Sequence, residues 1–437
     1  MSIPNLPLAG LEIGFVTSLI CSLLLVCTTR WHGRYSLDAT RGVQKFHITP
    51  TPRIGGAAIM TGLWLALCFL PLAQQELLLP VLLASLPAFV FGLAEDLTRN
   101  VSVRARLLAT MASGAVCWFL TGVTLDHTGL APLDALLASL PAFLFGIAED
   151  LTRRVSISAR LLATMASGAL CWALTDVRIL DTGIAPLDSA LAWVPLSVLF
   201  TAFAVGGVAN AVNIIDGFNG LASGTVIIGL ASLGFIADGC GDAELARLCF
   251  LICAVTAGFF LVNFPFGKLF LGDGGAYLLG FLLSWLSVML VYRNPDVSPW
   301  APLLACAYPV FETVFTIARR LWCRRHPGQP DSCHLHSLVK IAITGRYFRA
   351  FSAPLRNAFV SPFCWAIAAV PAWLAVRFAG NTPALLPATV ASFALYLGFY
   401  WYVAHAARAR RRRAMRSQAR VAASIAALAP EPEPVQT

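Results

Sequence analysis

Long apolar segments alternate with short polar ones along the whole chain of 437 residues. A membrane hydrocarbon core of about 30 Å needs roughly 20 apolar residues in a helix. The pattern predicts about thirteen such helices, at residues 11–29, 54–72, 78–94, 105–122, 134–148, 159–175, 190–208, 222–237, 246–262, 275–291, 301–318, 361–377 and 383–403. Backbone polar groups in lipid must be satisfied within helices or closed barrels, and the alternation typical of barrel strands is absent from the sequence. The predicted fold is therefore an all-α polytopic membrane protein.

An internal repeat accounts for two of these helices. Residues 82–118 return almost unchanged as residues 136–172, so that tandem units extend over 83–136 and 137–190. Identity this high is typical of a recent duplication rather than of an ancient structural repeat, and an error of sequence assembly is the alternative. Without the repeat the chain has about eleven predicted helices. We expect a protein that lacks residues 84–137 to fold.

Basic residues are distributed unevenly between the predicted loops. With the N-terminus outside, the outside segments contain only four of the 31 Lys and Arg residues, namely Arg178, Arg247, Arg293 and Arg377. The positive-inside rule then predicts an N-out, C-in orientation. We predict one polytopic domain over residues 1–403 and a cytoplasmic tail over 404–437 that is first basic and then disordered. Because topology explains the net charge of +9, no nucleic-acid partner is implied.

Polar clusters interrupt the apolar pattern at the predicted cytoplasmic helix ends. They are GVQKFHITPTPRIGG (42–56), AEDLTRNVSVRAR (94–106) with its second copy, NAVNIIDGFNGLASG (210–224), NFPFGKLFLGDGGAYLLGF (263–281) and DSCHLHSLVK (331–340). Carboxylates at several loop ends suit Mg²⁺, which prefers oxygen ligands and usually retains waters and substrate phosphates. Glycines let the backbone approach phosphates, and Arg, Lys and His neutralise phosphate charge. The clusters indicate transfer of a phosphorylated group, and we expect the helix to give way within 210–224, where irregular backbone lines a water-filled site.

These motifs resemble those of the bacterial polyprenyl-phosphate N-acetylhexosamine-1-phosphate transferases of glycosyltransferase family 4. That family includes the phospho-N-acetylmuramoyl-pentapeptide transferase of peptidoglycan synthesis and the GlcNAc-1-phosphate transferase that initiates O-antigen synthesis. The phrases NAVNIIDGFNGLASG and FLGDGGAYLLGF are the most specific, and the similarity runs over residues 30–345. The resemblance implies an enzyme of the bacterial inner membrane, with its active site on the cytoplasmic face. It would transfer an N-acetylhexosamine 1-phosphate from a UDP-sugar to undecaprenyl phosphate, release UMP and initiate a cell-envelope polysaccharide.

The resemblance assigns a paired-acid motif to the loop after the third predicted helix. The two aspartates of the family fall on Glu95 and Asp96, and in the second copy on Glu149 and Asp150. Asp96 is expected to act as the base or as the phosphate-positioning acid, with Glu95 beside it. We favour the first copy because Arg104 follows it, whereas the second copy has a serine at that position.

The other motifs supply the remaining residues that the resemblance implies. The magnesium aspartate of the family falls on Asp273, with Asp216 as a second metal and catalytic candidate, and Mn²⁺ is the alternative metal. The histidine loop falls on His334 and His336, which are also catalytic candidates, and it looks like the loop of the O-antigen branch. The candidates for substrate binding are Lys45, Arg104, Asn210, Asn213, Asn219 and Lys268, where Asn219 replaces an aspartate common in the family.

The sequence leaves two alternatives to an active transferase open. A transporter or lipid flippase is the rival from another class, although transporters bind substrate near the bilayer midplane and the acids of this chain cluster at one predicted face. A catalytically impaired family member is the second rival. The expected sugar is GlcNAc or a deoxy N-acetylhexosamine rather than the muramoyl pentapeptide. The expected partners are the two substrates and inner-membrane lipids, and a homodimer is an open alternative.

Glu312 stands out because it is an acid inside a predicted membrane helix. Acids within the membrane are functional candidates by default. The simpler interpretation is a hydrogen bond to a neighbouring helix, and the sequence favours this simpler role.

Overall fold

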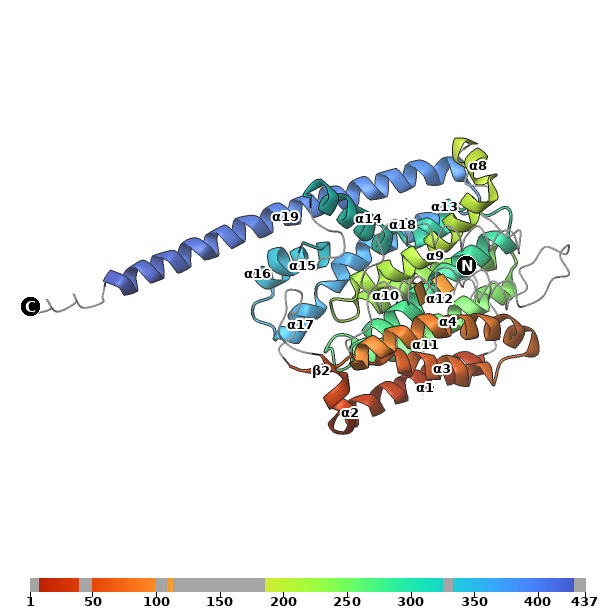
Figure 1. Ribbon diagram of the computed structural model, residues 1–437, viewed down its shortest axis with the longest axis horizontal. Helices are drawn as coiled ribbons and strands as arrows, with labels where there is room; N and C mark the ends of the chain where they lie inside the picture. Colours follow the sequence, from red (N-terminus) through yellow and green to blue (C-terminus); the bar gives the residue numbers. More distant parts are fainter. Residues whose placement is uncertain are drawn as a thin grey trace, which may run out of the picture.

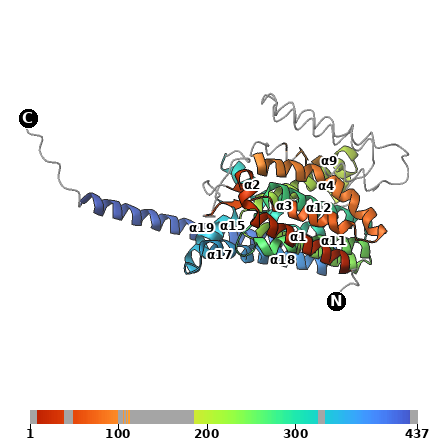
Figure 2. The same cartoon turned by 90° about the horizontal axis from the view of Figure 1, so that it is seen from below.

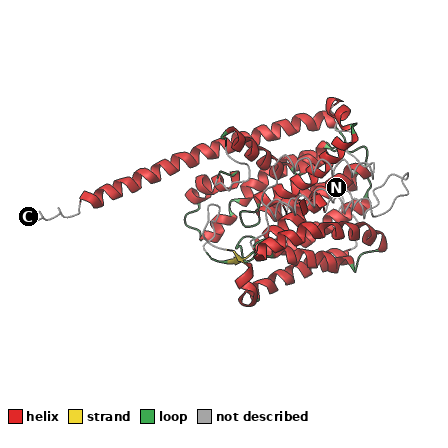
Figure 3. Ribbon diagram, in the orientation of Figure 1, coloured by secondary structure: helices red, strands yellow, loops and turns green. Residues whose placement is uncertain are grey.

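The computed structural model describes residues 8–38, 49–98, 105, 108–109, 111–112, 185–324 and 333–427. Six helices in these ranges are long and apolar enough to cross a membrane, or seven if the bent helix α4 is counted as one span. Strand is limited, within the same ranges, to one short antiparallel pair, and Figure 3 shows how completely helices dominate. The predicted all-α polytopic membrane fold is thereby confirmed, while the total of thirteen helices and the orientation stay predictions.

The first described part forms two long helices, two shorter ones and the strand pair. The helices are α1 (Leu8–Cys27), α2 (Thr29–Ser36), α3 (Gly55–Leu67) and α4 (Leu72–Thr98). The strands β1 (Leu37–Asp38) and β2 (Thr51–Pro52) lie between α2 and α3, with Leu37 opposite Pro52. The predicted helices over 134–148 and 159–175, and most of the one over 105–122, lie outside the described residues.

The second part contains the central and C-terminal helices. They are α8 (Ala185–Leu191), α9 (Val194–Ile215), α10 (Leu221–Gly239), α11 (Ala243–Asn263), α12 (Gly272–Arg293), α13 (Trp300–Ala305) and α14 (Ala307–Trp322). Then follow α15 (Leu335–Val339), the π-helical turn η1 (Lys340–Thr344), α16 (Gly345–Tyr347), α17 (Ala353–Ala358), α18 (Ser361–Arg377) and α19 (Thr382–Ala427).

Helix α12 lies at the centre of this arrangement. In the hydrophobic window of α12 83% of the residues are buried, compared with 22% in α1. Helices α3, α4, α9 and α10 pack around it. The outer helices α18 and α19 instead expose large apolar side chains such as Trp373, Leu395 and Trp401. Side chains of this kind are expected on a surface that faces lipid.

Helix α9 is longer than its apolar sequence predicts. The pattern predicts an end at residue 208, but the helix continues to Ile215 and includes Asn210 and Asn213. The predicted end at residue 208 is therefore too early, whereas the expectation that the helix gives way within residues 210–224 is confirmed. The spacing of three residues between the two asparagines puts both side chains on one helix face, and both bond residues of α12. Irregular backbone is confined to the turn over residues 216–220.

The helix predicted over residues 301–318 is broken in two. Helix α13 ends and α14 begins at Cys306. Pro309 has no backbone N–H and so cannot bond the carbonyl of Ala305, which favours a break in the helix at this point. The break leaves α14 free to carry Glu312 against the C-terminal helices.

Helix α19 continues far beyond the predicted end of its membrane segment. It stays helical through the basic stretch to Ala427, and Figure 1 shows it projecting away from the other helices. Alanine and arginine both favour helix, and the basic stretch therefore extends the membrane helix. The boundary expected between residues 403 and 404 does not correspond to the end of a helix.

Several short elements gather at one end of the bundle. Figures 1 and 2 show α2, α15 and α17 at the end from which α19 projects. The strand β2 lies at this end as well, whereas α8 lies at the opposite end in Figure 1. The end that carries α2, β2, α15 and α17 holds the polar side chains described next.

Candidate active site

Arg53 brings together acids from three separate segments. Its guanidinium Nη2 lies 2.8 Å from Asp273 Oδ1, its Nε lies 2.9 Å from Asp96 Oδ1, and its Nη1 lies 3.7 Å from Asp38 Oδ1. Arg53 directly follows β2, and Asp38 ends β1, so the strand pairing places the two side chains next to each other. Asp96 lies in the last turn of α4 and Asp273 in the first turn of α12. Elements far apart in the sequence therefore meet around one cation.

Asp96 also caps the N-terminus of α12. Its Oδ1 accepts a hydrogen bond of 2.9 Å from the backbone N–H of Asp273, and its Oδ2 accepts one of 2.9 Å from the N–H of Gly274. A carboxylate at this position satisfies unpaired N–H groups and interacts favourably with the helix dipole. The residue is only 1% exposed. The acid that the sequence proposes as base or phosphate-positioning group is thus buried and bonded by α12 and Arg53.

Gly272 makes this contact possible. Its backbone is left-handed, with φ of 76°, a conformation that only glycine adopts without strain. A Cβ atom at this position would also lie 2.5 Å from Asp96 Oδ2 and would collide with the carbonyl of Arg53. The sequence GDGG therefore needs its first glycine so that Asp96 and Arg53 can reach the start of α12.

The asparagines of α9 join the same site from the other side. Asn213 Nδ2 donates a hydrogen bond of 3.1 Å to Asp273 Oδ1, and Asn210 Oδ1 accepts one of 3.2 Å from the hydroxyl of Tyr277. Asp216 directly follows α9. At about 3.8 Å per residue, its Cα lies within roughly 11 Å of the Cα of Asn213. The aspartates Asp216 and Asp273 are therefore at the same end of the bundle.

Asn219 occupies a different environment. It is 5% exposed, and its Nδ2 donates to the carbonyls of Pro265, at 2.9 Å, and Pro354, at 3.3 Å. The hydroxyl of Ser361 donates a 2.6 Å hydrogen bond to the carbonyl of Asn219. The side-chain N–H groups thus tie the turn after α9 to the loop after α11 and to the first turn of α17, which explains an amide where the family commonly has an acid.

The histidine segment lies against the turn after α9. A Cβ atom placed on Gly217 would lie 3.3 Å from His336 Nε2, and the ring of Phe218 meets the His336 ring edge-on at a centroid distance of 5.5 Å. The rings of His334 and His336 are parallel, with centroids 5.3 Å apart and an interplanar angle of 6°. Two motifs that are more than a hundred residues apart in the sequence are therefore in contact.

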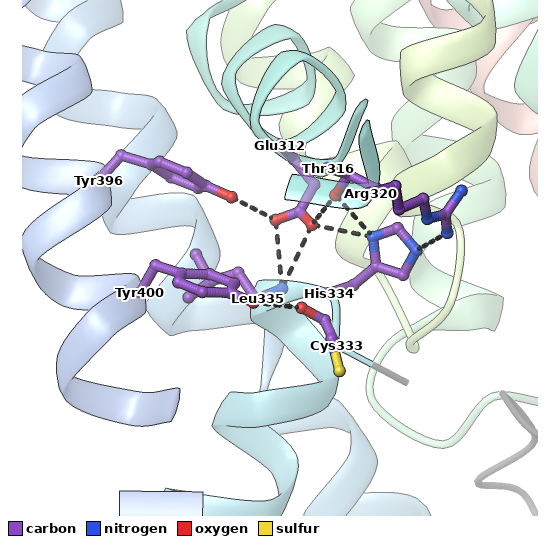
Figure 4. Close-up of polar contacts among 8 residues, drawn as sticks. All are labelled: Glu312, Thr316, Arg320, Cys333, His334, Leu335, Tyr396 and Tyr400. Carbon is purple, nitrogen blue, oxygen red and sulfur yellow. Dashed lines mark hydrogen bonds and ion pairs between the residues drawn. The ribbon is translucent and has the colours of Figure 1, made fainter. Parts of the chain in front are cut away.

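Glu312 holds the histidine segment in place, as Figure 4 shows. The residue is 0% exposed, and its Oε1 accepts a hydrogen bond of 2.9 Å from His334 Nδ1. The backbone N–H of Leu335 and the hydroxyl of Thr316 also donate to this carboxylate. Its Oε2 accepts a 2.9 Å hydrogen bond from the hydroxyl of Tyr396. The interpretation of Glu312 as a hydrogen-bond partner of neighbouring elements is confirmed.

The sequence interpretation missed most of the side chains around Glu312. Glu312, Thr316 and Arg320 follow each other at intervals of four residues, which places them on one face of α14, and all three are buried. This spacing of polar residues was the sign in the sequence that one face of the helix carries a buried polar cluster. Tyr396 gave no comparable signal, because an aromatic residue within an apolar helix is ordinary core material.

The remaining predicted site residues divide into two groups. Glu95 lies beside Asp96 in α4, and Lys268 is exposed on the loop between α11 and α12. The other candidates lie outside the described residues, and they are Lys45, Arg104, Glu149 and Asp150. The structure thus brings the first copy of the paired-acid motif to the site through Asp96.

Lys340 adds positive charge after the two histidines. It begins η1 and is half-buried. Burial, and to a smaller extent the positive charge of Arg356, lowers the pKa of Lys340 to about 8. Two basic groups close together next to the histidine segment would favour an anion in their vicinity.

The oxygen-rich side chains fit a magnesium ion that is shared with a substrate. Within the described ranges, no group of three or more His, Cys, Asp or Glu side chains could hold a metal by itself. Mg²⁺ is usually bound by one or two carboxylates together with substrate phosphates and waters. Asp273, with a side chain 15% exposed and next to the Asn213 amide, offers this kind of donor set.

The fold and these contacts define a multi-pass membrane protein with a polar site at one end of its helices. Residues 132–291 match the model of glycosyl transferase family 4. This match supports the family that the motifs predict. The matched range includes the second copy of the paired-acid motif, at Glu149 and Asp150, and lies after the first.

Relatives with assigned activities support the same family. A probable undecaprenyl-phosphate N-acetylglucosaminyl 1-phosphate transferase of Bacillus subtilis is 36% identical over 149 residues, or 33% of this chain and 40% of the relative. The decaprenyl-phosphate N-acetylglucosaminephosphotransferase of Mycobacterium leprae is 28% identical over 354 residues, which cover 76% of both chains. An undecaprenyl-phosphate alpha-N-acetylglucosaminyl 1-phosphate transferase of Escherichia coli is 31% identical over 150 residues, or 41% of that protein. The Bacillus and Escherichia alignments thus span less than half of either relative.

Proposed function

We propose that this protein transfers an N-acetylhexosamine 1-phosphate from a UDP-sugar to undecaprenyl phosphate. The relatives are named as transferases of N-acetylglucosamine 1-phosphate to polyprenyl phosphates. The observation that carries the proposal is the meeting of Asp273, Arg53 and Asn213 at the start of α12. Transfer of a charged phosphoryl group needs such groups to act on one substrate, and both Arg53 and Asn213 lie within hydrogen-bond distance of Asp273.

The reaction is a single exchange of phosphoric anhydride bonds. An oxygen of the lipid phosphate attacks the phosphorus that is attached to the sugar. The bond from that phosphorus to the oxygen bridging to the UMP phosphate breaks, and UMP leaves with the bond's electron pair. The products are UMP and a lipid-linked sugar diphosphate.

The side chains around α12 suit the recognition of such a highly charged substrate. Arg53 and Asn213 orient the carboxylate of Asp273, and Asp96 orients both Arg53 and the first turn of α12. Asp96 is bonded by three donors, and this favours a positioning role over that of a base. His336 places a hydrogen-bonding group beside the turn that contains Asp216, and Lys340 adds a positive group one helical turn further along the chain.

We also propose that the site binds Mg²⁺ through Asp273 and Asp216. When bound, the ion would neutralise charge on the sugar-nucleotide diphosphate. We expect that EDTA abolishes turnover, that Mg²⁺ restores it, and that Mn²⁺ substitutes in part. Full activity in the presence of EDTA would contradict the metal requirement.

We further propose that the site end of the bundle faces the cytoplasm of a bacterial inner membrane. Helix α12 has 22 residues, which at about 1.5 Å per residue gives roughly 33 Å, close to the thickness of a hydrocarbon core. The basic extension of α19 projects from the same end as the site, and basic segments favour the cytoplasmic side. A role in O-antigen or a related envelope glycan, with GlcNAc or a deoxy N-acetylhexosamine as the sugar, fits this location.

The proposal is tested with purified protein, undecaprenyl phosphate, Mg²⁺ and a panel of UDP-N-acetylhexosamines. We expect UMP release with at least one donor, and no release when the lipid is left out. The absence of UMP with every donor would overturn the proposed activity. Transport of the lipid or sugar by reconstituted vesicles without UMP release would favour the transporter alternative.

A further inference from the structure

We propose that Glu312 is a positioning residue that fixes the proton of His334 on Nδ1. This inference rests on the proposed function, because it assigns a role to a residue beside the proposed substrate site. The consequence is that His334 Nε2 is held without a proton, as a hydrogen-bond acceptor facing Arg320, in a ring that stacks on His336.

Two partners at opposite edges of the His334 ring select the same tautomer. Nδ1 lies 2.9 Å from Glu312 Oε1, and a carboxylate can only accept a hydrogen bond, so Nδ1 must carry the proton. Nε2 lies 3.5 Å from Nη2 of Arg320. A guanidinium can only donate, so Nε2 at this position must accept.

Glu312 is itself fixed, and the fixing groups come from several elements. Tyr396 of α19 donates to Oε2, Thr316 of the same helix as Glu312 donates to Oε1, and the N–H of Leu335 donates to both oxygens. Figure 4 shows that these groups approach the carboxylate from different sides. A buried carboxylate held in this way can orient an imidazole, as the acid of a catalytic triad does.

Helix α19 also holds the chain that carries His334. The hydroxyl of Tyr400 donates a 2.9 Å hydrogen bond to the carbonyl of Cys333, directly before His334. Arg410 donates to the carbonyls of Ile341, in the first turn of η1, and of Gly345, directly after η1. The segment is thus tied to α19 at both ends, which keeps the ring of His334 in register with Glu312.

The tautomer can be measured directly by ¹⁵N NMR of protein labelled at its seven histidines. The signal of His334 is assigned from its loss in His334→Asn. We expect the wild-type ring to carry its proton on Nδ1 and to show an unprotonated Nε2. A wild-type ring protonated on Nε2 would overturn the proposal, whatever the enzyme activity is, and this measurement needs no Glu312 variant.

The variant Glu312→Gln tests the positioning role. Its amide can donate to Nδ1 as well as accept from it, so we expect the preference for the Nδ1 proton to weaken and kcat/KM to fall by about tenfold or more. An unchanged tautomer would overturn the proposal. A changed tautomer with unchanged kcat/KM would overturn the role in the reaction.

Two tyrosine variants complete the design. Tyr396→Phe removes one donor to Glu312 but retains the carboxylate, and we expect a smaller loss of kcat/KM than in Glu312→Gln. Tyr402→Phe is the matched control, because Tyr402 lies on the same helix and is 64% exposed. Equal losses in both variants would contradict a specific contact. If wild-type protein releases no UMP with any donor, the proposed function fails, while the NMR result still decides the tautomer.

Discussion

The carboxylate of Asp273 illustrates how single residues depend on distant parts of the chain. Its Oδ1 accepts hydrogen bonds from Arg53, which follows β2, and from Asn213 on α9. Its own backbone N–H bonds Asp96 of α4. Removing the charge of Asp273 would therefore affect the proposed substrate site while leaving the buried cap of α12 intact.

We predict that Asp273→Asn lowers turnover by about 100-fold or more, because the variant loses the carboxylate proposed to bind the metal. The thermal midpoint of the detergent-purified protein should change little. Asp242→Asn is the matched control, since Asp242 pairs with Arg293 at the other end of α12, at 2.6 Å. Turnover of Asp273→Asn at the level of Asp242→Asn would refute the metal role.

Lys340 gives a prediction for stability against pH. Its usual pKa of 10.5 is lowered to about 8 in the folded protein, by burial and by Arg356. Between these two values the unfolded chain binds more protons than the folded one, so stability should rise with pH in this window. We expect the thermal midpoint of Lys340→Gln to lack this rise when both proteins are compared from about pH 7.5 to about pH 10. Parallel curves for the two proteins would contradict the lowered pKa.

For single residues, the sequence predicted which side chains belong to the site better than it predicted what each side chain does there. Asp96, Asp273, Asn213 and the histidines could be named because short motifs carry them. The sequence could not tell that Asp96 caps a helix whose first turn lies 177 positions later, because that contact depends on how α4 and α12 pack. Arg53 was visible only as one basic residue in a polar loop.

Among the helices, the crossing of α4 and α12 is the contact that assembles the site. A Cβ atom on Gly92 would lie 2.6 Å from the Cα and the N of Gly274, so the two helices touch through their glycines. Close approach of this kind is typical of small residues at membrane helix contacts. It brings the last turn of α4 within reach of the first turn of α12.

The duplication makes this crossing testable. We predict that Asp96→Asn lowers turnover by at least about tenfold, because only one side-chain oxygen remains for three donors. Asp150→Asn should retain turnover, because the first copy of the motif bonds α12. The opposite ranking would mean that the second copy, which the family model matches, performs this task. UMP release by both variants, purified in parallel, decides between the copies.

Helix positions were largely predictable, while helix ends were not. The apolar pattern predicts α10, α11, α12 and α18 to within a few residues of their observed ends. It places the end of α9 too early, because asparagines lower the local hydrophobicity without breaking a helix. It misses the short elements α15 to α17, because helices this short form only when they pack against neighbouring elements and leave no local pattern.

For the whole molecule, the principal feature is that motifs from five parts of the chain lie at one end of the helices. The contacts of Arg53, Asn213, Gly217 and His336 join these parts directly. Alternation of the chain across a membrane predicts this common end, since every second loop lies on the same side. The absolute orientation follows from charge alone and is a separate prediction.

Two exposed cysteines can test the orientation. Cys240 follows α10 at the end that carries Asp242, and Cys323 follows α14 at the end that carries the histidines. We predict that a membrane-impermeant maleimide labels Cys240 in spheroplasts and Cys323 only in inverted vesicles. Peptide mapping by mass spectrometry identifies the labelled position. The reverse pattern would place the site on the outer face.

The hold of α19 on the histidine segment bears on how the protein should be produced. A chain shortened to end just before Arg410, so as to remove the basic stretch, would lose that residue's bonds to Ile341 and Gly345 and yet keep every membrane-crossing segment. We expect such a sample to be a poor catalyst, and its low activity could be mistaken for a wrong choice of sugar donor. An affinity tag belongs after Ala427, well clear of the last contact.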